Sequence, residues 1–129
     1  MTEGSSGLDL LAALPDSLEI HPGKRALLPT GIQIALPEGF EAQVRPRSGL
    51  AVREGIGILN APGTIDSDYR GEIQVILFNT GEASFTIRRG MRIAQLIISP
   101  VIKARLTVVD NLDATVRGAG GFGHTGYAH

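Results

Sequence analysis

The stretch EIQVILFNTGEASFTIR, residues 72–88, decides the fold class of this chain. Residues 72–79 have the apolar composition of a strand, and residues 84–88 carry a second, shorter pattern of the same kind. Thr80-Gly81-Glu82 lies between them and has the residue types of a turn. The stretch therefore predicts two strands that are joined as a hairpin.

Similar short patterns recur on both sides of this stretch. Their spacing of about 8 to 12 residues is typical of a β-sandwich or β-barrel. One short helical turn is expected, with Ser48 capping its start and Gly55 ending it. Residues 60–63, Asn-Ala-Pro-Gly, have Pro and Gly where a type II turn needs them. The other strands are expected at residues 26–36, 40–46, 55–59, 91–98 and 101–109.

Composition supports an all-β fold. The 17 glycines and 7 prolines divide the chain into short segments, and 129 residues with 43% apolar side chains suffice for one globular domain. The apolar pattern ends near residue 110. We therefore expect a β-barrel over residues 1–110 and a C-terminal arm over residues 111–129.

The charge and the residue types exclude several classes of function. A formal net charge of -1 gives no general attraction to nucleic acids or to anionic membranes, so an anion site has to be local. The chain has no cysteine for thiolate chemistry, and its three histidines lack the spacing of metal ligands. The sequence shows neither a leader pattern nor an apolar run that could cross a bilayer, so we expect a cytoplasmic protein.

The segment PRSGLA, residues 46–51, is a candidate phosphate site. Backbone N–H groups at the start of a helical turn can bind a phosphate together with the Arg47 guanidinium and the Ser48 hydroxyl. The alternative interpretation is an ordinary turn that is capped by Ser48.

The segment GTIDSDYRGEI, residues 63–73, joins two apolar strands through a polar excursion. One of its carboxylates, Asp66, Asp68 or Glu72, could act as a general base toward water, and Tyr69 could stack on a ring or a sugar. Asp and Gly are also the usual residues of a polar turn, which is the alternative interpretation, above all for Asp68 and Glu72.

Two further polar residues lie among apolar neighbours. Asp9 belongs to GLDLLAAL, residues 7–14, and Gln95 belongs to RRGMRIAQLI, residues 88–97. Each has a plain alternative, since Asp9 suits a turn or a cap and Gln95 suits the solvent face of a strand.

The segment RGAGGFGHTG, residues 117–126, has glycines in the spacing of a dinucleotide-binding loop. Too few residues follow it to form the helix that such a loop requires. A Gly-rich tail without a role is the simplest alternative. Arg117 and Phe122 favour a mobile arm that closes over an anion attached to a flat ring.

Taken together and in this order, GLDL, PRSGLA, LNAPGTIDSDYRGEI, RGMRIAQLI and RGAGGFGHTG resemble the five motifs of the homotrimeric dUTPases, which hydrolyse dUTP to dUMP and pyrophosphate. The resemblance extends from residue 7 to residue 126. It implies a jelly-roll-like β-barrel with a flexible C-terminal arm, a homotrimer with shared active sites, and Mg²⁺ as cofactor. Such a reaction keeps uracil out of DNA and supplies dUMP for dTMP synthesis.

The resemblance also implies a role for each candidate residue. Asp66 would deprotonate the water that attacks the α-phosphorus. Mg²⁺ would be bound through phosphate oxygens and water, with Asp9 acting through metal-bound water or by orienting an arginine. The residues expected to bind the substrate are Asn60 at uracil, Tyr69 at deoxyribose, Arg47, Ser48, Gly49 and Gln95 at the phosphates, Arg117 at the terminal phosphate, Phe122 over the uracil, and Gly123, His124 and Thr125 in the arm.

The chain departs from the family pattern at one point. Members of the family carry a further strand before the GLDL motif, whereas only MTEGSS precedes Gly7, so we expect the barrel edge or the assembly to differ. The alternative functions are a dCTP deaminase or bifunctional relative, a non-catalytic nucleotide sensor or protein-binding module, and a structural β-sandwich. The segment GTIDSDYRG and the complete arm favour the hydrolase.

Overall fold

The computed structural model describes residues 2–128, which form short strands and one short helix. The elements in chain order are β1 Leu8–Leu11, β2 Leu18–Ile20, β3 Arg25–Pro29, β4 Phe40–Arg45, α1 Ser48–Glu54, β5 Ile56–Ile58, β6 Gly63–Ile65, β7 Gln74–Asn79, β8 Phe85–Ile87 and β9 Arg92–Pro100. The prediction of an all-β fold is confirmed.

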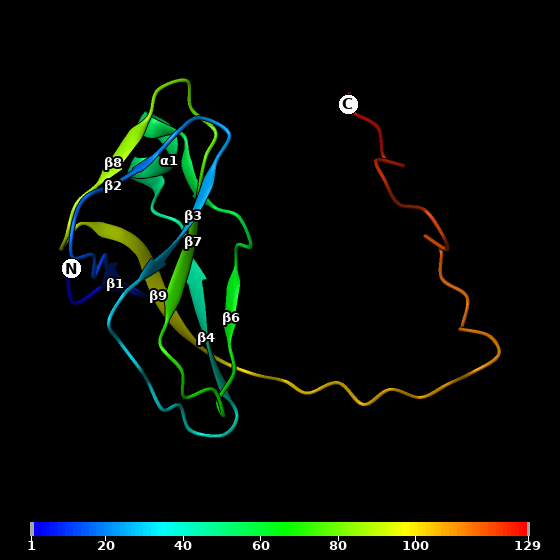
Figure 1. The fold of residues 1–129 in the computed structure, drawn as a ribbon. Helices are drawn as coiled ribbons and strands as arrows, with labels where there is room; N and C mark the ends of the chain where they lie inside the picture. Colours follow the sequence, from blue (N-terminus) through cyan, green and yellow to red (C-terminus); the bar gives the residue numbers. More distant parts are fainter. Residues whose placement is uncertain (1, 129) are drawn as a thin grey trace.

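The strands form three antiparallel sheets around one apolar core (Figure 1). The largest sheet has the order β1-β9-β4-β6, the second has the order β3-β7-β5, and the third pairs β2 with β8. Alternate side chains of the central strands point inward, as in β7, where Val75 and Leu77 are buried. All three sheets contribute to the core, for example through Leu10, Leu28 and Ile87.

The predicted hairpin of residues 72–88 is wrong, although both of its strands exist. β7 pairs with β3 and β5, whereas β8 pairs with β2. Asn79 lies between them, fully buried; its side chain donates to the carbonyls of Ile20 and Ala83, both at 2.9 Å, and accepts a hydrogen bond from Gly81 N–H at 2.8 Å. Because these bonds hold the turn against β2, the chain joins a different sheet after β7.

Two other predicted strands are not formed as expected. The strand predicted at residues 26–36 ends at Pro29, because Gly31 adopts a left-handed φ of 71° and its N–H donates to Glu72 Oε1 at 2.8 Å. The strand predicted at residues 101–109 is absent from the part of the chain that the structure describes, where the segment makes one backbone hydrogen bond to the barrel, from Val101 N–H to Gly39 O at 2.8 Å, and pairs with no strand. A strand needs a partner for its backbone hydrogen bonds, and the local pattern does not reveal whether one exists.

The predicted helical turn is confirmed as α1. Gly55 ends it in a left-handed conformation with φ of 69°, as expected. The predicted cap is wrong, since Arg47 occupies the N-cap position without a side-chain hydrogen bond and Ser48 is the first helical residue. The type II turn is wrong as well, because Gly63 begins β6 without the positive φ that this turn requires; the Ala61–Pro62 peptide is cis.

Beyond Pro100 the chain leaves the barrel, and Figure 1 shows the C-terminus lying apart from the sheets. The segment at residues 101–109 is extended, and Ile102, Leu106 and Val108 are 92–100% exposed. Among residues 2–128, none of the helical structure is both long enough and apolar enough to span a membrane.

Candidate functional site

The order of the largest sheet brings three separate sequence segments together. β9 lies between β1 and β4, so that Gln95 is opposite Asp9 on one side and opposite Arg45 on the other. Gln95 Nε2 donates to the carbonyl of Pro46 at 3.1 Å, which ties the strand to the start of the PRSGLA segment. The alternative interpretation, in which Gln95 is simply a residue on the solvent face of a strand, therefore does not account for these contacts.

Asp9 is held by two arginines. Its Oδ1 lies 3.7 Å from Arg47 Nε, and its Oδ2 lies 3.3 Å from Arg92 Nε. Arg47 Nη1 also lies 3.4 Å from the carbonyl oxygen of Arg92, so the two guanidiniums approach the carboxylate from neighbouring segments. Sequence reasoning missed Arg92, although it lies three residues before Gln95 in the same motif.

An open cavity of about 570 Å³ surrounds this group. It gathers the predicted phosphate residues Arg47, Ser48, Gly49 and Gln95 together with Asp9. Arg53 and Arg92 add two cations that were not predicted, so three arginines and one aspartate line the cavity. The spacing of four residues between Gly49 and Arg53 on a helix is the signal that would have found Arg53.

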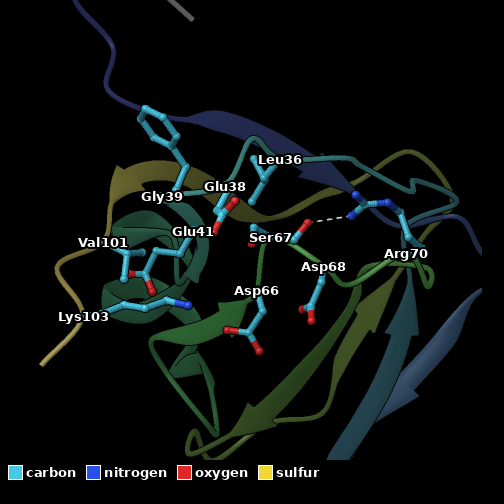
Figure 2. A pocket seen from close by; sticks show the side chains of 11 residues that line it. Leu36, Glu38, Gly39, Glu41, Asp66, Ser67, Asp68, Arg70, Val101 and Lys103 are labelled. Atoms are coloured by element: carbon cyan, nitrogen blue, oxygen red, sulfur yellow. Dashed lines mark hydrogen bonds between the residues drawn. The ribbon is translucent and has the colours of Figure 1, made fainter. Parts of the chain in front are cut away.

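The loop after β6 holds the predicted base. Tyr69 N–H donates to the carbonyl of Asp66 at 3.2 Å, and Tyr69 Oη donates to the carbonyl of Glu72 at 2.8 Å. Arg70 Nη1 donates to the carbonyls of Ser67 at 2.6 Å and Tyr69 at 3.0 Å. Figure 2 shows Arg70 turned back toward Ser67, and the carboxylates of Asp66 and Asp68 extending from the loop. Gln33 Nε2 also donates to the carbonyl of Arg70 at 3.1 Å, so the loop is fixed while Asp66 stays exposed.

Three adjoining cavities surround this loop. The largest, about 600 Å³, has a predominantly acidic lining that includes Asp66. A second one, about 220 Å³, lies between Asp66, Tyr69 and Gln74, and a third one, about 70 Å³, contains Asn60 and shares Gln74 with the second. The predicted nucleoside residues therefore line neighbouring spaces, which have no lining residue in common with the cavity around Asp9.

The predicted arm residues lie at neither set of cavities. Residues 117–126 form consecutive tight turns, with hydrogen bonds from Gly120 N–H to Arg117 O at 3.2 Å and from Gly126 N–H to Gly123 O at 2.8 Å. Gly123 has a φ of 82°, a conformation that favours glycine. The side chain of Phe122 is fully exposed. Within this single chain, Arg117, Phe122, Gly123, His124 and Thr125 are separated from the other candidate residues.

The donor atoms fit a magnesium ion that is held mainly by a substrate. Among residues 2–128, no group of three or more His, Cys, Asp or Glu side chains could hold a metal by itself. Asp9 is an oxygen donor in an open, polar cavity, and its side chain keeps 23% of its surface exposed. Since Mg²⁺ usually retains several waters and binds substrate phosphates, one such carboxylate suffices to contact its water shell.

The fold is that of the solved dUTPases. The dUTPase of Staphylococcus bacteriophage 80alpha with dUpNHpp matches at a TM-score of 0.88 and 24% identity, covering 98% of this chain and 89% of that one. A mutant dUTPase of S. aureus phage phi11, described with a structural Mg(II) ion, matches at a TM-score of 0.76 and 20% identity, covering 85% and 86%. The predicted jelly-roll-like barrel, also called the β-clip fold, is confirmed.

The sequence comparisons define the family. The dUTPase family model matches residues 1–126. Deoxyuridine 5'-triphosphate nucleotidohydrolases of Desulfotalea psychrophila and Chlamydia pneumoniae are 58% and 57% identical to the chain, covering 97% of it in each case and 83% and 87% of the relatives. The chain belongs to the dUTPase family and is a dUTP diphosphatase, which confirms the resemblance.

Proposed function

We propose that this chain hydrolyses dUTP to dUMP and pyrophosphate through water activated by Asp66, in active sites that a homotrimer shares. The observation that carries the proposal is the cavity that Arg47, Arg53 and Arg92 line, because three arginines suit a polyphosphate. The reaction would keep uracil out of DNA and supply dUMP for dTMP synthesis.

Asp66 acts as the general base. Its carboxylate accepts a proton from a water molecule whose oxygen forms a bond to the α-phosphorus. The bond from that phosphorus to the bridging oxygen breaks, and pyrophosphate leaves. The hydrogen bonds of Tyr69 and Arg70 to backbone carbonyls support this role, because they fix the loop that carries Asp66 and leave its carboxylate free to accept a proton.

The phosphate chain binds to Arg47, Ser48, Gly49 and Gln95. The Ser48 hydroxyl supports this assignment because it does not cap α1 and can donate to a phosphate oxygen. Asp9 orients Arg47 and Arg92 through its ion pairs and can also accept from metal-bound water. A magnesium ion on the phosphates would neutralise their charge.

The nucleoside binds along the Asn60 to Tyr69 segment. The Asn60 amide pairs with the edge of uracil, and the narrow space beside it excludes a 5-methyl group and presents the wrong partners to cytosine. The Tyr69 ring, 45% exposed, covers the deoxyribose and leaves no room for a 2′-hydroxyl. This arrangement would refuse dTTP, dCTP and UTP.

Each active site is shared between copies of the chain. The phosphate cavity carries an excess of arginine, whereas the cavity at Asp66 carries four carboxylates against Arg70 and Lys103. These opposite charges favour contact between the cavity of one copy and that of the next. The extended segment at residues 101–109 supports assembly as well, because its exposed apolar side chains lack cover within one chain.

The arm beginning at residue 111 closes the site of a neighbouring copy. Residues 1–110 form the barrel domain, whose last segment is the extended one that packs against another copy. Arg117 binds the terminal phosphate, and Phe122 stacks on uracil. Gly123, His124 and Thr125 follow the nucleotide closely. Support comes from the complete exposure of Phe122 and from the short turns of residues 117–126, which can move as a unit.

The assembly can be tested with Leu106→Asp. Leu106 is 92% exposed in the single chain, so the barrel should still fold, but a carboxylate on the apolar face of residues 101–109 should prevent burial against another copy. We expect the mass measured by light scattering to fall from three chains to one. Thr107→Asp, on the opposite side of the extended segment, adds the same charge and should preserve the trimer. Retention of three chains by Leu106→Asp would contradict this interface.

The activity is tested by pyrophosphate release with Mg²⁺ and, separately, dUTP, dTTP, dCTP and UTP. We expect turnover of dUTP, and a kcat/KM for dTTP, dCTP and UTP that is at least about 100-fold lower. Each of these three nucleotides would either clash with the site or leave a polar group of the site unpaired. Ammonia release from dCTP would instead identify a deaminase. Binding of dUTP without turnover would identify a sensor.

A further inference from the structure

We propose that Arg53 is a further phosphate-binding residue, which acts on the nucleotide from the last turn of α1. The inference rests on the proposed function, since it takes the cavity around Asp9 as the site of the phosphate chain. Arg53 lies outside the set of substrate residues that the sequence motifs indicate.

The geometry of α1 directs Arg53 into this cavity. Arg53 follows Gly49 by four residues, which places both on one face of the helix, and helical side chains lean toward the N-terminus. A Cβ atom added to Gly49 would lie 2.7 Å from Arg53 Nη2 and 3.4 Å from its Cζ. The guanidinium therefore lies over Gly49, and the missing side chain at Gly49 is what admits it.

Arg53 differs from the two neighbouring arginines in its partners. Arg47 and Arg92 both pair with Asp9, at 3.7 Å and 3.3 Å. Within residues 2–128, Arg53 makes neither an ion pair nor a side-chain hydrogen bond of its own. Its donors are thus available, and a guanidinium can bind two oxygens of one phosphate group at once.

A purely structural role accounts less well for this placement. An arginine in the last turn of a helix can stabilise the helix by lying near its terminal carbonyl groups. The guanidinium of Arg53 instead points back along α1 and lines the same cavity as Ser48 and Gln95. The position thus favours a ligand that is anionic and occupies the cavity.

The test compares Arg53→Gln, Arg53→Lys and Arg25→Gln in the chain of 129 residues. Arg25 is exposed at the start of β3, outside the cavity, so Arg25→Gln is a matched control for the loss of one positive charge. The probes are inorganic pyrophosphate with Mg²⁺ and, separately, deoxyuridine, each measured by calorimetry and as an inhibitor of dUTP turnover.

We expect Arg53→Gln to weaken pyrophosphate binding by about 10-fold to 100-fold, because hydrogen bonds to a charged group are lost. The pyrophosphate affinity of Arg53→Lys should lie between those of Arg53→Gln and the unmodified chain, since lysine keeps the positive charge but lacks the planar guanidinium with its paired donors. Both Arg53 variants should bind deoxyuridine within about twofold of the unmodified chain. The Arg25→Gln variant should bind pyrophosphate within about twofold of the unmodified chain.

Two results would overturn the inference. One is pyrophosphate binding by Arg53→Gln within about twofold of Arg25→Gln. The other is an equal loss for pyrophosphate and deoxyuridine, which would indicate a general disturbance of the fold. Absence of dUTP turnover by the unmodified chain would instead refute the proposed function, and the pyrophosphate calorimetry would still report on Arg53.

Discussion

Asp66→Asn should lower kcat for dUTP by roughly 10² to 10⁴ while the protein remains folded and assembled. The amide has nearly the same shape but cannot accept the proton of the attacking water, and general base catalysis contributes a factor of this size. Asp66 is exposed and its carboxylate holds no other part of the loop, which is fixed by hydrogen bonds from Tyr69, Arg70 and Gln33. Steady-state kinetics should therefore show a large change in kcat and a small change in KM.

Asp68→Asn is the matched comparison for this variant. Asp68 lies two residues further along the same loop and lines the same cavity of about 600 Å³. If both variants lost activity equally, the base would not be Asp66 alone. Circular dichroism and light scattering on both proteins would exclude loss of folding or assembly as the cause.

A chain that ends at Val116 should lose at least about 100-fold in kcat/KM for dUTP. The truncation removes Phe122, whose stacking on a base is worth about 1–3 kcal/mol, and Arg117, whose charge-assisted hydrogen bonds contribute about 1.5–3 kcal/mol. The thermal unfolding temperature should stay unchanged, because within residues 2–128 the apolar core contains no residue beyond Val116. Differential scanning calorimetry and initial rates measure the two effects.

Point variants divide the effect of the arm between its residues. Phe122→Ala and Arg117→Gln should each reproduce part of the loss. Tyr127→Ala is the control, because Tyr127 is an equally exposed aromatic residue just beyond the GGFGHTG segment. Full activity of the truncated chain would show that the active site is complete without the arm.

The period of the side chains predicted most of the strands but not their partners. β7 was recognised by its apolar composition, and β4 by its alternation, since neighbouring residues of a strand face opposite sides of a sheet. The partner of β8 could not be predicted, since it depends on Asn79, whose buried hydrogen bonds join segments up to 59 residues apart. Residues 101–109 have the pattern of a strand, yet the single chain provides no partner for it.

The sequence by itself determined the all-β class, the helical turn at α1 and the residue types that a polyphosphate and a pyrimidine require. These features depend on backbone periodicity and on the chemistry of single side chains, which are local properties. Only the tertiary structure decided that β9 inserts between β1 and β4, which brings Gln95 beside Asp9 and unites them with Arg47. It also separated this group from Asp66 and turned Arg53 over Gly49, because packing of the whole core selects strand partners and side-chain directions.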